Sequence, residues 1–237
     1  MTVKQLYLKL LGRQRTSIRG SRELLYLELL FQELSEAGVN NFTPKPFGAA
    51  ANSSLLYVYV RLCKELQPNL VVELGAGETT RLGSALMDVS KIKNLVAYEQ
   101  DEFWANRIQQ FAPSANVIHS KLSDDDDQRY VNFTHNSFDL LIIDGPVKTQ
   151  GRGRHGAIKY INETQKTDFT VVIDDIQRNS EWQLAKKIFD LLNQKHNAKI
   201  EIIEATKAQA IITVGSHTDI PRLGSLSTPN YPVRSIN

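Results

Sequence analysis

The sequence predicts an α/β fold in which helices cover a doubly wound sheet of seven strands, mostly parallel. Between residues 69 and 216, short apolar runs alternate with stretches that have helical spacing. The runs LLII and VVI are apolar at every position, which indicates strands buried on both faces, as in a parallel sheet. The last two runs are separated by too few residues for a crossover helix, so they predict an antiparallel C-terminal hairpin.

Two helices are expected before this alternation begins. Residues 22 to 38 carry leucines and aromatics at helical spacing and end at a glycine. Residues 54 to 66 form the next helix, for which Asn52 or Ser53 can serve as the N-cap. We therefore interpret residues 1 to 50 as an N-terminal helical extension.

The α/β domain is expected to span residues 51 to 216, and an irregular tail follows at residues 217 to 237. Its strands are predicted at residues 69–74, 94–99, 115–120, 138–144, 169–174, 199–205 and 209–215. Its helices are predicted at residues 79–89, 102–111 and 180–194. Ser180 and Gln183 have the spacing of a capping box at the start of the last helix.

Composition excludes several classes of protein. The 237 residues include 28 Lys and Arg against 26 Asp and Glu, so the overall charge does not indicate a nucleic-acid binder. The apolar stretches fall short of the ~20 residues that span a bilayer, and no secretory signal is recognisable, so a cytoplasmic location is expected. Cys63 is the only cysteine, which excludes an intrachain disulfide and CxxC chemistry.

The N-terminal segment is locally basic, since residues 1 to 22 contain six Lys and Arg and no acid. A membrane-surface helix is one interpretation of this pattern. We favour a helix that packs on the body of the protein or on a second subunit, which would make a homo-oligomer.

The stretch VVELGAGETTRLG, residues 71 to 83, predicts a ligand-binding turn between a strand and a helix. Glycines at 75 and 77 let the backbone approach a ligand, either a dinucleotide or S-adenosylmethionine. Thr80 stands where the dinucleotide fingerprint requires its third glycine. The carboxylate of Glu73 would repel a pyrophosphate and attract an ammonium group. Glu99, at the end of the second strand, can accept hydrogen bonds from ribose hydroxyls of either ligand.

Three further acids lie at the carboxyl ends of the fourth and fifth strands, namely Asp144, Asp174 and Asp175. If these strands are neighbours, the carboxylates either raise one another's pKa or share a cation. Mg²⁺ suits such oxygen ligands and would lower the pKa of a hydroxyl. Alternatively, Asp144 acts as a metal-free base or only shapes its turn, and Asp175 caps a loop or helix.

The chain resembles the class I S-adenosylmethionine-dependent methyltransferases over roughly residues 52 to 215. The resemblance lies in ELGAGETT, Glu99, the FDLLIIDGP and VVIDD strands and the closing hairpin. It implies a Rossmann-like fold in which the seventh strand inserts antiparallel near the edge. The IDGP and VIDD segments are similar to catechol-type small-molecule and carbohydrate O-methyltransferases, although those end the fifth strand in Asp-Asn.

The resemblance also implies site residues. Glu73 would orient the loop and the methionyl ammonium, Gly75 and Gly77 would leave room for the cofactor, and Glu99 would hold the ribose. The adenine would be bordered by Ser120, Lys121 and Leu122.

The loop at residues 147 to 156 is expected to overhang the acceptor. It is locally cationic through Lys148, Arg152, Arg154 and His155, and His155 is a secondary candidate base. A solvated loop is the alternative to a lid that grips an anionic or sugar substrate. The DGPV run differs from the Asn-Pro-Pro-aromatic motif of nucleobase amino-methyltransferases, which argues against DNA as the substrate.

These patterns together predict a transferase that moves a methyl group from S-adenosylmethionine to a hydroxyl of a small molecule or sugar, with or without Mg²⁺. Two alternatives remain open at the level of sequence. One is an NAD-dependent oxidoreductase on the same sheet, and the other is a cofactor-binding module without catalytic activity.

Overall fold

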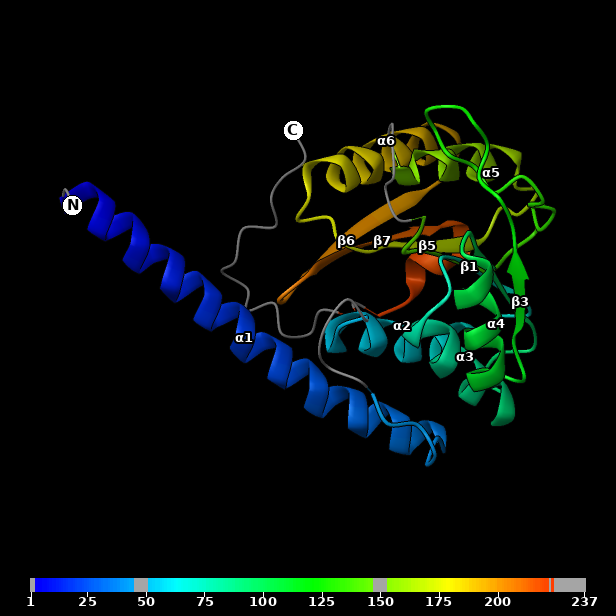
Figure 1. Cartoon of the computed structure of the whole chain (residues 1–237), viewed down its shortest axis with the longest axis horizontal. Helices are drawn as coiled ribbons and strands as arrows, with labels where there is room; N and C mark the ends of the chain where they lie inside the picture. Colours follow the sequence, from blue (N-terminus) through cyan, green and yellow to red (C-terminus); the bar gives the residue numbers. More distant parts are fainter. Residues whose placement is uncertain (1–2, 45–50, 147–152, 222, 224–237) are drawn as a thin grey trace.

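A computed structural model describes residues 3 to 44, 51 to 146, 153 to 221 and 223, with side chains described from residue 18 onward. Seven strands form one sheet in the order β3-β2-β1-β4-β5-β7-β6. Helices cover both faces of this sheet (Figure 1). The strands are β1 Val71–Leu74, β2 Leu95–Glu99, β3 Asn116–His119, β4 Leu140–Ile143, β5 Phe169–Ile173, β6 Ala198–Glu204 and β7 Ala208–Val214.

The register of the strands confirms the predicted topology. β1 to β5 are parallel, whereas β7 runs antiparallel between β5 and β6, with Ile173 opposite Ala210. The carboxyl ends of the parallel strands therefore share one edge of the sheet. The turn between β6 and β7 reaches the same edge, because β7 begins beside the end of β5.

The helices form two layers, each with its own hydrophobic core. α2 Ser53–Leu66, α3 Glu78–Asp88 and α4 Glu102–Phe111 lie on one face, while α5 Ala157–Glu163 and α6 Asn179–Lys195 lie on the other (Figure 1). Two clusters of buried side chains fill the spaces between these layers and the sheet. Every residue of β1, β4 and β5 is buried, as the continuous apolar runs predicted.

The N-terminal segment is one long helix, α1 Val3–Ala37, of 35 residues. At 1.5 Å per residue it is about 52 Å long, and its N-terminal end projects beyond the sheet and its covering helices (Figure 1). Its C-terminal half packs on α2, where Tyr26 and Tyr57 place their ring centroids 5.4 Å apart and Leu30 is fully buried. This half of α1 is therefore part of the main core.

Helix starts show where local patterns succeed and fail. Asn52 is the N-cap of α2, and its side chain accepts from the N–H of Leu55. The capping box expected at Ser180 is wrong, because α6 begins one residue earlier, after Arg178. The N–H of Arg178 donates to the carbonyl of Asp175 at 2.9 Å, so that turn sets the start of α6.

None of the described helices combines the length and the apolar character that crossing a bilayer requires. Two short 3₁₀ helices complete the described chain, Gly153–Gly156 before α5 and Gly215–Asp219 after β7. The first of them occupies the end of the loop predicted at residues 147 to 156, of which residues 147 to 152 lie outside the described part.

Candidate functional site

The backbone conformation and packing within the protein require a glycine at position 75. Its φ of +95° is in the left-handed region, and a Cβ there would lie 2.8 Å from the backbone nitrogen of Gly145. Gly145 is equally constrained, since its own Cβ would lie 2.7 Å from the Cα of Gly75. The turns after β1 and β4 therefore pack backbone against backbone.

Gly77 lies in a different environment. Its backbone is extended, and no described atom lies within 4 Å of the position that a Cβ would take. The N–H of Gly77 donates to the hydroxyl of Thr80 at 2.9 Å, which begins the first turn of α3. Of the two glycines, Gly77 is the one that faces free space.

Glu73 is fully buried beneath this turn. One of its carboxylate oxygens accepts hydrogen bonds from the hydroxyls of Thr80 at 2.6 Å and Thr79 at 3.2 Å. Burial raises the pKa of Glu73 to about 7, although these donors oppose the shift. The structure thus places Glu73 between β1 and the start of α3, where it holds the turn together.

Glu99 fixes the glycine turn from the end of β2. Its carboxylate accepts from the N–H of Ala76 at 3.1 Å and from the N–H of Asp101 at 2.9 Å. Burial raises its pKa, and the backbone donors act in the opposite direction. The indole of Trp104 donates to the carbonyl of Ala76 at 2.8 Å, so the Ala76 peptide is held from both sides. No motif around Trp104 predicted this contact.

The segment predicted to border an adenine lies next to Glu99. The N–H of Ser120 donates to the carbonyl of Glu99 at 2.9 Å, directly after β3. Lys121 is exposed, and Leu122 forms an isolated bridge with Tyr130. These residues therefore share the edge of the sheet with the glycine turn.

Asp144, Asp174 and Asp175 meet beside this turn, at the ends of β4 and β5. Each offers a carboxylate oxygen, and these oxygens all lie within 4.8 Å of one another. The side chain of Asp144 is 25% exposed, whereas those of Asp174 and Asp175 are 0% and 4% exposed. Only Asp144 is open to a ligand. Burial and the neighbouring Asp174 raise the pKa of Asp144 to about 7, while Arg154 and Lys207 oppose the rise.

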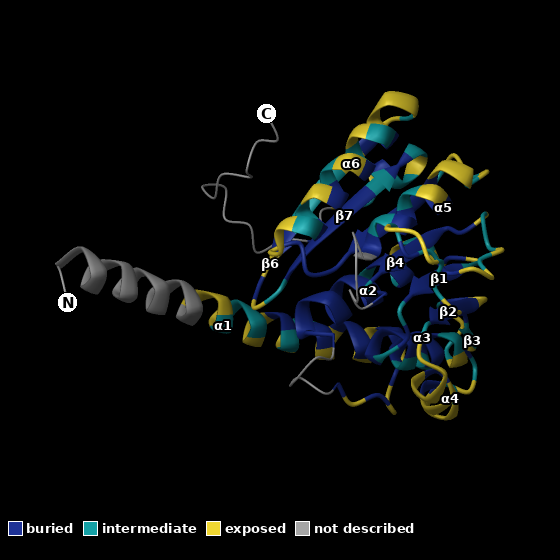
Figure 2. Cartoon of the chain, turned by 45° about the horizontal axis from the view of Figure 1, so that its top comes forward, coloured by how far each residue is buried: buried dark blue, intermediate teal, exposed yellow. Residues whose placement is uncertain are grey.

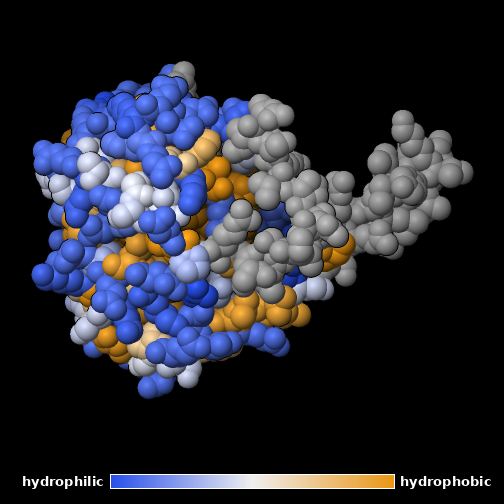
Figure 3. Space-filling model, turned by 180° about the vertical axis from the view of Figure 1, so that it is seen from behind, coloured by the Kyte–Doolittle hydropathy of each residue, from blue (hydrophilic) through white to orange (hydrophobic). Residues whose placement is uncertain are grey.

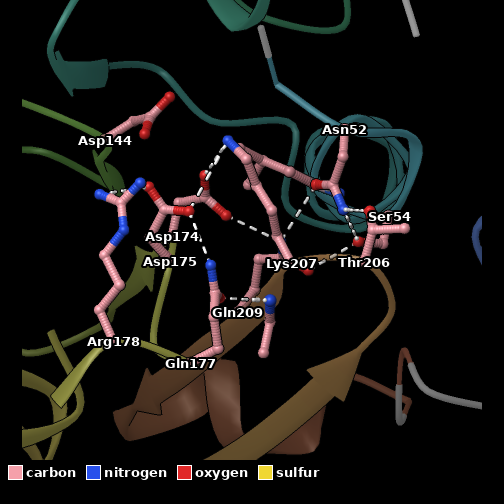
Figure 4. Close-up of polar contacts among 12 residues, drawn as sticks. Asn52, Ser54, Asp144, Asp174, Asp175, Gln177, Arg178, Thr206, Lys207 and Gln209 are labelled. Carbon is pink, nitrogen blue, oxygen red and sulfur yellow. Dashed lines mark hydrogen bonds and ion pairs between the residues drawn. The ribbon is translucent and has the colours of Figure 1, made fainter. Parts of the chain in front are cut away.

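Three cations neutralise the three acids, and Figure 4 shows two of them, Arg178 and Lys207. The guanidinium of Arg154 lies 3.0 Å from Asp144 and 3.3 Å from Asp175. The ammonium of Lys207, from the turn between β6 and β7, lies 3.2 Å from Asp174 and 3.7 Å from Asp175. Arg178 completes the set with an ion pair of 3.0 Å to Asp175. Neighbouring cations hold the pKa of Asp175 below its usual value despite its burial.

Neutral side chains extend this acid cluster to α2 (Figure 4), and a hydrogen bond of Asn52 continues it to α1. Gln209 on β7 donates to Asp174 at 2.8 Å and to Asn52 at 3.2 Å. The amide of Asn52 donates in turn to Glu23 on α1 at 2.9 Å. A chain of hydrogen bonds thus runs from the long helix to the buried carboxylates.

His155 lies apart from the acids, although it follows Arg154 directly. Its Nε2 is 3.3 Å from the carbonyl of Ser180, at the start of α6. The structure therefore brings Arg154 to the carboxylates and turns His155 toward another helix. Lys148 and Arg152, predicted in the same cationic loop, lie outside the described residues.

A cavity of about 690 Å³ lies along β6, where residues of α1 and α6 also line it. Gln177, Arg178 and Lys207 line it and also contact the acid cluster. The glycine turn is not part of its lining, so this cavity is separate from the open space at Gly77.

Comparison with known proteins supports the fold. No family model and no curated protein sequence matches the chain. A precorrin-6y C5,15-methyltransferase from Geobacter metallireducens has a TM-score of 0.51 with 11% identity, covering 75% of this chain and 96% of that chain. The O-methyltransferase from Bacillus cereus in complex with SAH has a TM-score of 0.49 and 15% identity, over 80% of this chain and 90% of that one.

TomG, an O-methyltransferase from Streptomyces achromogenes solved with SAM, has a TM-score of 0.49 and 13% identity, over 84% of this chain and 98% of that one. At such identities only the architecture is shared. The chain has the Rossmann-like fold of methyltransferases, as the strand order and the Geobacter enzyme both indicate.

The two glycines of the turn should respond differently to substitution. Gly75→Ala should lower the free energy of unfolding by about 2 kcal/mol or more, because the new Cβ meets Gly145 and φ is positive. Gly77→Ala should lower it by less, about 1 kcal/mol, because the new Cβ meets no described atom but alanine is a poorer N-cap of α3 than glycine. Urea unfolding of both variants checks this, and equal losses would contradict the close backbone contact between Gly75 and Gly145.

Glu73 should make the stability of the protein depend on pH. Its pKa is about 7 in the folded protein and has the ordinary value of 4.5 in the unfolded chain, which therefore loses this proton first as the pH rises. This single group should therefore lower the free energy of unfolding by about 3 kcal/mol between pH 4.5 and 7.

Urea unfolding at several pH values tests this contribution. Glu73→Gln should remove it, leaving a flatter pH profile, whereas the exposed control Glu102→Gln should retain the wild-type slope. An unchanged slope in Glu73→Gln would show that the carboxylate is ionised in the folded protein.

Proposed function

We propose that this protein transfers a methyl group from S-adenosylmethionine to a hydroxyl group of a small molecule or sugar. The observation that carries the proposal is Asp144, a partly exposed carboxylate whose pKa is raised to about 7. It follows β4, the strand next to β1, and thus lies close to the open glycine turn. The methyltransferase fold is consistent with this assignment.

The residues present fit the cofactor. The open position at Gly77 gives room over the turn. Glu99 retains lone pairs for ribose hydroxyls, because each carboxylate oxygen can accept two hydrogen bonds. We assign the adenine border to Ser120, Lys121 and Leu122. When bound, S-adenosylmethionine supplies a methyl group on a positively charged sulfur, which the nearby carboxylates favour electrostatically.

Asp144 is proposed as the general base. An acceptor hydroxyl that donates a hydrogen bond to Asp144 is oriented for attack, and its proton passes to this carboxylate. The oxygen would bond to the methyl carbon as the bond from that carbon to sulfur breaks, and the electron pair would stay on the sulfur of the departing S-adenosylhomocysteine. Because the side chain is 25% exposed, the proton can then leave to water. Arg154 positions Asp144 through its hydrogen bond of 3.0 Å. His155 receives no role in this step, since it contacts Ser180 instead.

The acid cluster is a poor fit for a resident Mg²⁺ ion. Its oxygens are close enough to share a divalent ion. However, Arg154 bridges Asp144 and Asp175, and Lys207 pairs with Asp174, so the carboxylates already have their counter-charges. A divalent ion would have to displace these cations. The proposed transfer therefore contains no step that depends on a metal.

Thr80 counts against the NAD alternative. It replaces the third glycine of the dinucleotide fingerprint, and its hydroxyl is committed to Glu73 and to the N–H of Gly77.

The Asp144→Asn variant should retain cofactor binding and lose turnover. Calorimetry should detect S-adenosylhomocysteine binding in the micromolar range for both wild type and variant. Release of S-adenosylhomocysteine with a panel of phenolic and sugar acceptors should fall roughly 100-fold or more in the variant. The exposed control Asp190→Asn should retain activity. Absence of binding at millimolar ligand would overturn the cofactor assignment.

The pH profile tests the role of Asp144 directly. The carboxylate must be ionised to accept a proton, so wild-type turnover should rise with pH through about 7 and then level. The residual activity of Asp144→Asn should lack this rise. A rise that persists in the variant would assign the base to another group.

Removal of divalent ions tests whether Arg154 and Lys207, and not a metal ion, neutralise the three carboxylates. Because Arg154 and Lys207 neutralise the acids, EDTA should leave turnover unchanged within about twofold. A complete loss that Mg²⁺ restores would instead support the metal site predicted from Asp144, Asp174 and Asp175.

A further inference from the structure

Helix α1 has two apolar faces, of which only one is buried. Tyr26 and Leu30 pack into the core with 4% and 0% exposure. Leu24 and Phe31 are 66% and 50% exposed. These two residues are seven positions apart and therefore lie on the same side of the helix. Two more exposed residues with the same spacing lie beside them, Ile18 and Leu25.

This apolar stripe, Ile18, Leu24, Leu25 and Phe31, has no role in the proposed chemistry. Figure 2 shows exposed and partly exposed residues along α1 where the helix leaves the body. In Figure 3, hydrophobic atoms are exposed on the side of the molecule from which α1 projects. Large apolar side chains with a seven-residue repeat are typical of a helix that packs against another helix.

The charges of α1 indicate what kind of helix fits. Residues 3 to 22 carry six Lys and Arg and no acid, whereas residues 23 to 37 carry four Glu and no Lys or Arg. Neighbours on α2 only partly offset the acidic half. Arg61 and Lys64 are shared among Glu33, Glu36 and Glu65. A second copy of this helix, running in the opposite direction, would therefore be complementary in charge.

We propose that α1 is a dimerisation element that packs antiparallel on α1 of a second copy through the apolar stripe. A crossing centred near Ser21 sets Leu24 against Ile18 of the second copy. It also sets the exposed Glu28 opposite the basic segment that contains Arg13 and Arg15. A parallel pair would place six cations beside six others, which is unfavourable. The antiparallel pair is a closed two-fold arrangement that uses the same face on both copies.

Light scattering during size-exclusion chromatography of the full chain tests the interface. The wild type should be a dimer at micromolar concentration. Leu24→Glu combined with Phe31→Glu should be a monomer with an unchanged circular dichroism spectrum, because both side chains are exposed in the single chain. As a control, Phe103→Glu on α4, where the native side chain is 73% exposed, should remain a dimer. A monomeric wild type, or a dimeric double variant, would overturn the proposal.

Disulfide trapping tests the direction of the helices. Ser21→Cys should form a disulfide-linked dimer under mild oxidation, because position 21 meets its copy at the crossing. Glu28→Cys should not, because its two copies would lie about 21 Å apart along the axis. The native Cys63 is buried and does not interfere. Equal cross-linking of both variants would show a parallel pair and overturn the antiparallel arrangement.

Discussion

The candidate site depends on the mutual neutralisation of charges at the ends of β4, β5 and β7. Two of the three carboxylates are almost fully withdrawn from water, and burying an unpaired charge is strongly unfavourable. Arg154 and Lys207 remove this penalty from two sides. The sheet order makes the pairing possible, because inserting β7 beside β5 carries the turn with Lys207 to the acids.

A second constraint places Asp144 near the glycine turn. Gly75 and Gly145 allow the turns after β1 and β4 to touch through their backbones. Asp144 precedes Gly145 directly, and its N–H donates to the carbonyl of Leu74 at 3.0 Å. The position of the carboxylate relative to the glycine turn is thus fixed by main-chain contacts, while the space beside Gly77 stays open.

The fold could be predicted from the sequence because continuous apolar runs that alternate with helical stretches are typical of a parallel sheet covered by helices. The structural role of each single residue could not be predicted from the sequence. The contact that requires Gly75 joins segments seventy residues apart. Arg154 and His155 are adjacent in a cationic loop, and only the 3₁₀ turn determines which one faces the acids. The start of α6 was misplaced because the backbone turn from Asp175 to Arg178 begins the helix one residue before the local capping pattern predicted.

The contacts of Glu23 make α1 part of the structure that supports the acid cluster. Its carboxylate accepts hydrogen bonds from Asn52, from the N–H of Ser53 and from the hydroxyl of Thr206. One side chain of α1 thus clamps the start of α2 to the turn that bears Lys207. A shortened polypeptide beginning at residue 51 would keep every strand of the sheet. It would nevertheless lack the anchor that aligns these two segments, so the sheet and its covering helices depend on α1 for the position of the turn that bears Lys207.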